Sequence, residues 1–161
     1  MRRGADDFAL LLMRLGFGLG MALAHGLPKV QGLMAGETGF VQGVARLGFP
    51  YPYAFAWASA LIELVGGIAI ALGLFTRPFA GLNAANMVVA GFWRHHAHHQ
   101  LLGVTGFRTW TEEQLKAWGR PELALVYLLG FVALALMGAG ALGLDGVLVG
   151  GRNKKPRRKY D

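Results

Sequence analysis

The sequence predicts an all-α protein built as a bundle of four transmembrane helices. Of its 161 residues, 54% are hydrophobic and 16% are charged, whereas charged residues make up about 25% of soluble domains. The mean hydropathy is +0.41. Because each span needs roughly 20 apolar residues, four spans and their loops nearly fill such a chain. We therefore predict one membrane domain over residues 1–148, followed by a basic cytoplasmic tail over residues 149–161.

Apolar runs and their boundary residues define the four helices. The predicted spans cover residues 8–27, 53–75, 78–95 and 121–143. The first run resembles a secretory signal peptide with an A-x-A site at 22–24, but Arg14 interrupts its apolar region, so we expect an uncleaved helix. Pro78 suits the first turn of the third helix because proline lacks the backbone N–H that would be unpaired there.

The distribution of positive charge predicts the topology. The net charge of +7 is concentrated in the two tails. Together with Arg77 in the turn between the second and third spans, this places both termini on the cytoplasmic side. A basic tail beside a membrane span is typical of binding to anionic lipid, so we expect no nucleic acid partner.

The chain contains no cysteine. This excludes disulfides, thiolate metal ligands and covalent c-type haem attachment through this chain. Any redox function therefore requires a bound cofactor or a partner protein.

We assign the loop between the third and fourth spans to the outer face of the membrane. Its sequence predicts one short helix. Two overlapping capping boxes begin at Thr109 and Thr111. Trp110 and Trp118 lie two turns apart on one face of this helix. They indicate either a helix lying in the headgroup region or a tertiary contact of the two rings.

Ionisable residues inside the spans are the main candidates for a site. A charge at the bilayer centre costs about 2.5–3.5 kcal/mol on insertion scales, so Arg14 and Glu63 should face the bundle interior. We expect them to pair with each other, at the level of Asn83 and Asn86 on the third helix. His25 shares the face of Arg14.

This polar layer has two interpretations. In the first, the side chains only fix the register of the helices. In the second, they form a site in which Arg14 and Asn86 donate hydrogen bonds and Glu63 or His25 exchanges protons, as quinone binding requires. Asn83 would add a further contact to such a ligand.

A second polar group is expected at the outer face. Within the histidine run, the helical spacing of His95 with His98 or His99, and of His96 with His99, can hold a transition metal ion. The alternatives are a haem axial ligand or a turn that titrates near neutral pH. The other members of this outer group are His25, Lys29, Glu122 and Tyr127.

The order of these motifs resembles the DoxX family of small four-helix membrane proteins over residues 8–148. The motifs are Arg14, HGLPK at 25–29, ALIELVGG at 60–67, LGLFTR at 72–77, ANMVVA at 85–90, a histidine ending the third span, PELA at 121–124 and GLD at 143–145. The residues that match recurrent polar positions of the family are Arg14, His25, Lys29, Glu63, Asn86, His95 and Glu122.

The resemblance implies a multi-pass protein of the bacterial or archaeal inner membrane that is linked to redox metabolism. Relatives include the membrane subunit of a thiosulfate:quinone oxidoreductase. We therefore expect a membrane subunit of a quinone-linked oxidoreductase complex, with protein partners or further copies of itself. The alternative is a non-catalytic subunit that anchors or recruits partner proteins.

Overall fold

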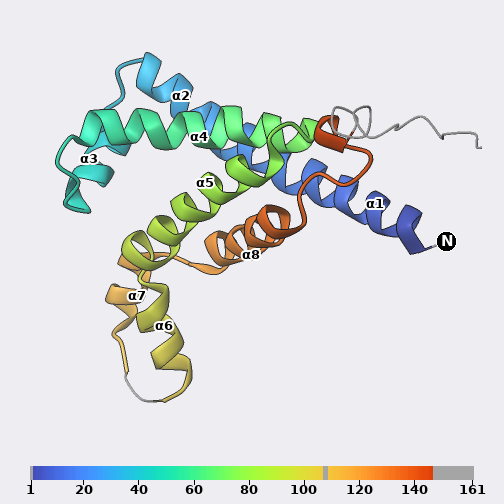
Figure 1. Cartoon of the computed structure of the whole chain (residues 1–161). Coiled ribbons are helices and arrows are strands. Elements are labelled where there is room, and N and C mark those ends of the chain that lie inside the picture. The colour runs from blue at the N-terminus through green and yellow to red at the C-terminus, as the bar shows by residue number, and fades with distance from the viewer. Residues whose placement is uncertain (1, 107–108, 147–161) are drawn as a thin grey trace, which may run out of the picture.

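The computed structural model describes residues 2–106 and 109–146, and this part of the chain is all-helical (Figure 1). Helices account for 80% of the structure, and the described ranges contain no strand. The all-α prediction is confirmed. The basic tail, which we expect to bind anionic lipid, lies outside the described residues.

The chain begins with one long helix. Its segments are α1 (Arg2–Met13), the π-type segment η1 (Arg14–Gly26) and α2 (Leu27–Met34). Residues Gly4–Met34 form a single apolar helix of 31 residues, long enough to cross a membrane. The helix continues through Pro28 to Met34, about two turns past Leu27, where the predicted span ends. As a result, Lys29 lies on the same helix as Arg14.

The second long helix is α4 (Pro52–Leu72), which also meets the requirements for a membrane span. It ends at Gly73, whose φ of 72° is the left-handed conformation typical of a helix C-terminus. Glycines bring η1 and α4 into direct backbone contact. A Cβ atom on Gly18 would lie 2.7 Å from the Gly67 carbonyl oxygen. Small residues at a helix interface allow this close approach in membrane proteins.

The segment between these two long helices contains α3 (Gly39–Arg46). Sequence analysis treated this region as a loop. The apolar side of α3 packs against α2 and α4, where Leu33, Val44, Ala56 and Ala60 are buried together. This small cluster holds α2 and α3 over the N-terminal half of α4.

The second half of the bundle consists of α5 (Thr76–Val88), which continues as the π-type segment η2 (Val89–Arg94), and α8 (Glu122–Met137). α8 ends six residues before the predicted boundary, because Gly138 and Gly140 have positive φ angles of 81° and 70°. The chain then returns to α5, where the Asp145 carboxylate accepts hydrogen bonds from the backbone N–H groups of Phe75 and Thr76.

Two shorter helices, α6 (Ala97–Val104) and α7 (Glu112–Trp118), extend from the end of the bundle where η2 ends and α8 begins (Figure 1). α7 confirms the predicted short helix and identifies its N-cap as Thr111. The Gln114 backbone N–H donates to Thr111 Oγ1, and the Thr111 N–H donates to Gln114 Oε1. α6 was not predicted.

The helices differ in their suitability for crossing a membrane. Within the described residues, two helices are long and apolar enough, and a third qualifies if α7 and α8, bent by 44° at their junction, are counted as one span. α5 with η2 is not among them. The count of four spans stays a prediction.

Candidate functional site

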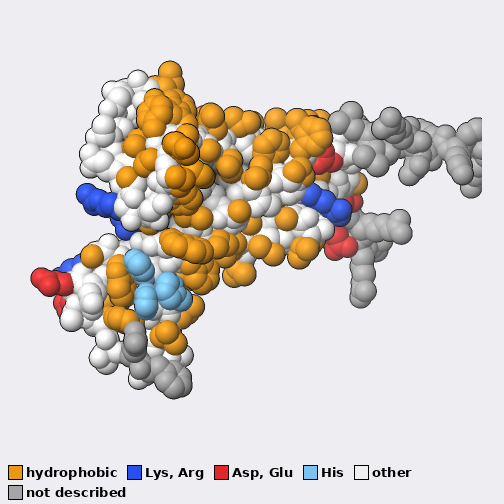
Figure 2. Space-filling model, turned by 60° about the vertical axis from the view of Figure 1, so that its left-hand side comes forward, with side chains coloured by type: hydrophobic (Ala, Val, Ile, Leu, Met, Phe, Trp, Pro, Cys, Tyr) orange, Lys and Arg blue, Asp and Glu red, His pale blue; other side chains and the backbone are white. Residues whose placement is uncertain are grey.

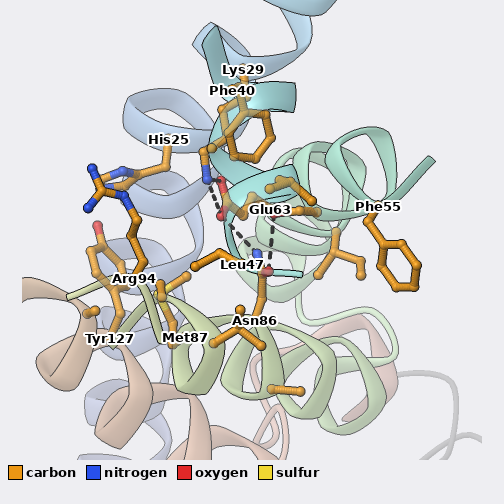
Figure 3. A pocket seen from close by; sticks show the side chains of 18 of the residues that line it. His25, Lys29, Phe40, Leu47, Phe55, Glu63, Asn86, Met87, Arg94 and Tyr127 are labelled. Carbon is orange, nitrogen blue, oxygen red and sulfur yellow. Dashed lines mark hydrogen bonds and ion pairs between the residues drawn. The ribbon is translucent and has the colours of Figure 1, made fainter. Parts of the chain in front are cut away.

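A cavity of about 720 Å³ lies between the long first helix, α3, α4, α5 with η2, and α8 (Figure 3). This size is within the usual range for small-molecule sites. Its wall is predominantly apolar, including Phe40, Leu47, Phe55 and Met87. Polar side chains gather in two places on this wall, one against α4 and one near the N-terminal end of α8.

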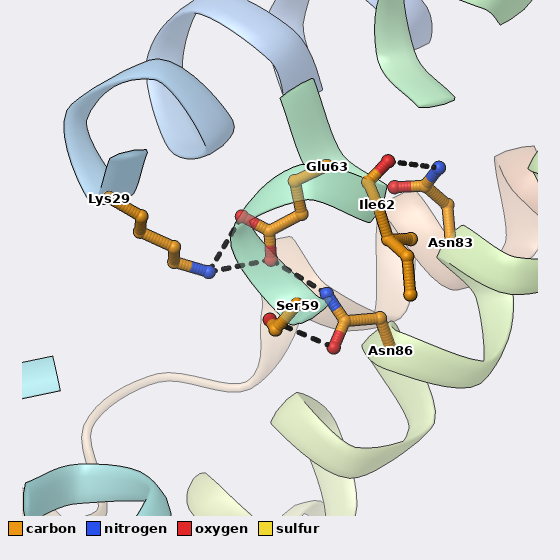
Figure 4. A network of polar contacts seen from close by, with 6 residues as sticks. All are labelled: Lys29, Ser59, Ile62, Glu63, Asn83 and Asn86. Carbon is orange, nitrogen blue, oxygen red and sulfur yellow. Dashed lines mark hydrogen bonds and ion pairs between the residues drawn. The ribbon is translucent and has the colours of Figure 1, made fainter. Parts of the chain in front are cut away.

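Glu63 is the centre of the first polar group. Its side chain is 1% exposed, yet it has three hydrogen bonds (Figure 4). Lys29 Nζ donates to both carboxylate oxygens at 2.5 and 2.6 Å, and Asn86 Nδ2 donates to Oε1 at 2.8 Å. A buried carboxylate is tolerated when it is both paired and hydrogen-bonded. Three helices are joined at this point.

The Lys29–Glu63–Asn86 group extends toward the cavity and toward the outer surface. Asn86 Oδ1 accepts a hydrogen bond of 3.1 Å from Ser59 Oγ. The Lys29 side chain is 29% exposed, and its ammonium group lies 4.8 Å from the centre of the Phe40 ring. Lys29 therefore connects a buried carboxylate to a partly solvated position.

The second polar group lies near the N-terminal end of α8. It comprises His25, Arg94, His95, Arg120 and Tyr127, all of which line the cavity. The rings of His25 and Tyr127 meet edge to face at 5.5 Å, and Arg94 also lines the cavity (Figure 3). Sequence analysis did not include Arg94 or Arg120 among the candidate site residues. Their positions at the ends of the predicted spans 78–95 and 121–143 could have identified both arginines as candidates for this group.

The predicted pair of Arg14 and Glu63 is wrong. Gly26, rather than Arg14, adjoins the backbone of Glu63 and Leu64. Arg14 and Gly26 are the first and last residues of η1, so they lie at opposite ends of this segment. The prediction placed Arg14 and Glu63 at one level of the bundle, whereas Arg14 adjoins Gly73, which follows the C-terminal end of α4 and lies ten residues beyond Glu63.

Arg14 is instead buried at the opposite end of the bundle. Its side chain is 0% exposed, and its Nη2 donates to the Leu142 carbonyl at 3.2 Å. The Arg14 guanidinium also adjoins Gly73 and Gly143, and it is attracted by Asp145. Arg14 does not line the cavity, so its predicted role as a hydrogen-bond donor there has no geometric support.

Two more candidates are separated from the cavity. Asn83 is fully buried, but its Nδ2 donates to the backbone carbonyls of Ile62 at 3.1 Å and Phe79 at 3.0 Å. It therefore ties α5 to α4. Glu122 is exposed at the start of α8 and is not among the residues that line the cavity.

The histidine run is divided by a break between η2 and α6. His95 Nδ1 lies 2.7 Å from the Trp118 carbonyl, whereas His96, His98 and His99 bring one ring nitrogen each to within 4.8 Å of one another. The predicted pair of His96 with His99 is thus brought together, whereas His95 is not a member of this group of three. Burial lowers the pKa of His96, and the neighbouring His99 and His98 lower it further.

Comparison with known proteins connects this site to a family. The DoxX family model matches residues 9–96. Inner membrane protein YphA of Escherichia coli is 31% identical over 141 residues, which cover 88% of this chain and 91% of that protein. A Haemophilus influenzae protein described as uncharacterized is 32% identical over 125 residues, covering 78% and 80% of the two chains. No solved structure matches the chain significantly.

Proposed function

Because this chain belongs to the DoxX family of membrane proteins, we propose that it is a multi-pass inner-membrane subunit of a redox complex and that its cavity binds a quinone. α5 with η2 and α8 complete four spans in this proposal, with both termini in the cytoplasm. The exposed leucine, valine and phenylalanine side chains of the long helices contact lipid (Figure 2).

The observation that carries the proposal is the polar group around Glu63 on the wall of a largely apolar cavity. A quinone combines an apolar tail with ring carbonyls that accept hydrogen bonds. The apolar wall suits the tail. Lys29 and Asn86 can donate to one carbonyl, and Glu63, which both of them contact, can exchange a proton with the ring.

The second polar group suits the other end of such a ring. His25 and Tyr127 line the same cavity, and either can donate to the second carbonyl or exchange a proton with it. Arg94 and Arg120 add positive charge, which favours the reduced, anionic forms of the ring. Electrons must come from a partner protein or a bound cofactor, because the chain has no cysteine for thiol chemistry.

Two asparagines of α5, the buried Asn83 and the half-buried Asn86, provide a matched test. Asn86 lines the cavity and Asn83 does not, although both are on one helix and bond to α4. Protein purified in mild detergent is extracted with organic solvent and its quinone is quantified. We expect Asn86→Ala and Glu63→Gln to lose quinone and Asn83→Ala to retain it. Equal quinone content in all variants, or no quinone in the wild-type protein, would overturn the proposal.

A second candidate function is that of a structural or assembly subunit. It is favoured by the closed hydrogen-bonding of Glu63, whose two oxygens already have partners within the chain. In that case Lys29→Met combined with Glu63→Leu should preserve partner binding and cellular function. Loss of function in a double variant that folds and reaches the membrane would contradict this alternative.

A further inference from the structure

We propose that His96, His98 and His99 form a binding site for a late first-row transition metal ion such as Zn²⁺. The site lies at the outer end of the bundle, apart from the cavity around Glu63. It does not depend on the proposed quinone function. The chain offers no thiolate, so the ligands are imidazoles, which suit zinc, copper, nickel and iron.

The three ring nitrogens are almost as close together as the ligand atoms around a bound metal ion. One nitrogen from each ring lies within 4.8 Å of the others. Ligands at about 2.0–2.1 Å from tetrahedral Zn²⁺ are separated by roughly 3.4 Å. Side-chain rotation closes this difference. His98 is exposed and free to turn about its side-chain bonds without disturbing the core.

The backbone at His96 creates this arrangement. Its φ of 50° is left-handed, and among the described residues only Phe75 shares a positive φ outside glycine. This conformation ends η2 and lets α6 begin in a new direction. His96 and His98, which would point to different sides of a continuous helix, thereby face a common point. Residues held in such sparsely populated conformations cluster at functional sites.

Aromatic rings from α7 support the imidazoles. The Trp118 ring lies 5.0 Å from that of His96 and 5.4 Å from that of His99, and Trp110 Nε1 donates to the His99 carbonyl at 2.8 Å. Phe92 stacks on His98 at 6.3 Å. The contacts from α7 limit the freedom of the His96 and His99 rings before an ion arrives, which reduces the entropic cost of binding, while His98 turns to complete the site.

The site retains an open coordination position. A surface hollow of about 700 Å³ is bounded by the three histidines and by Val88, Phe92 and Trp93. Figure 2 shows histidine side chains gathered at the surface beside apolar ones. Three histidine ligands with a free fourth position are typical of zinc sites that hold a water molecule or a substrate, whereas structural sites are closed.

A zinc titration tests the proposal. The full-length protein is purified with an affinity tag that lacks histidine, stripped by a chelator, and titrated with Zn²⁺ against a chromophoric chelator. We expect one Zn²⁺ per chain. His98→Asn should weaken binding more than about 10-fold, the lower bound for loss of even a supporting partner. His96→Asn should do the same while preserving the backbone, because asparagine tolerates a left-handed conformation.

The matched control is His25→Asn, which removes a histidine from the cavity and leaves the three ligands intact. It should bind Zn²⁺ like the wild-type protein. Circular dichroism checks the fold of each variant. If His96→Asn is misfolded, the result for His98→Asn decides, because His98 is exposed and its replacement leaves the core intact. Zinc X-ray absorption should show imidazole nitrogens at about 2.0 Å. Equal affinity of His98→Asn and wild-type protein, or a shell of oxygen ligands alone, would overturn the proposal.

Discussion

Lys29 and Glu63 form an ion pair between α2 and α4, with Nζ 2.6 Å from Oε2. The carboxylate is almost fully buried, whereas the lysine side chain is partly exposed. The two partners therefore depend on the pair to different degrees. Lys29 without Glu63 can turn toward solvent, but Glu63 without Lys29 remains a charge inside the bundle with Asn86 as its remaining donor.

This asymmetry predicts that Lys29→Met is more destabilising than the double variant Lys29→Met with Glu63→Leu. Removal of one partner of a buried ion pair costs about 3–5 kcal/mol, whereas replacement of both by apolar residues is often neutral. Thermal unfolding in detergent, followed by circular dichroism, measures the difference. If the double variant is at least as unstable as Lys29→Met, the instability of Lys29→Met does not come from an unpaired charge on Glu63.

The inward orientation of Glu63 and its proximity to Asn86 could be predicted from the sequence, because a carboxylate in an apolar helix must avoid lipid. The identity of its cationic partner could not. Lys29 follows Gly26 and Pro28, which usually mark the end of a helix. Only the packing of α2 on α3 and α4 shows that the helix continues and carries Lys29 to Glu63.

The contact between η1 and α4 predicts different effects for two neighbouring glycines. A Cβ on Gly18 would lie 2.7 Å from the Gly67 oxygen, while one on Gly16 would have nothing within 4 Å. Gly18→Ala should destabilise the protein by about 1–3 kcal/mol through overpacking. Gly16→Ala should be neutral or stabilising by about 0.5–1 kcal/mol, because alanine favours the helix. Unfolding in detergent compares the two, and equal effects would refute the close contact.

Asp145 connects the segment after α8 to the start of α5. Its carboxylate accepts hydrogen bonds from the N–H groups of Phe75 and Thr76 at 2.8 and 2.9 Å and attracts Arg14. Asp145→Ala should therefore cost about 1–2 kcal/mol, as loss of a helix N-cap does. Asp6→Ala is the control, since Asp6 is exposed and has no hydrogen bond among the described residues. Similar unfolding temperatures of both variants would contradict the capping role.

The ends of elements were harder to predict than their interiors. α4 was located well because a long apolar run ends in a glycine. α8 ended early, since the run 138–143 remains apolar in composition while Gly138 and Gly140 turn the backbone. The short helices α3 and α6 have too few apolar residues to stand out from a loop, and they are stabilised by contacts with other helices.

The proposed topology can be tested by cysteine labelling, because the chain has no cysteine of its own. Single cysteines replace Gly4, Glu37 and Glu113, which are all exposed. With four spans, a membrane-impermeant maleimide added outside should label positions 37 and 113, and position 4 only after permeabilisation. If only the two long helices cross, α5 and α8 lie on the cytoplasmic side, so position 113 would be labelled together with position 4. Labelling of 113 therefore decides between two and four spans, because it reports whether α5 with η2 crosses the bilayer.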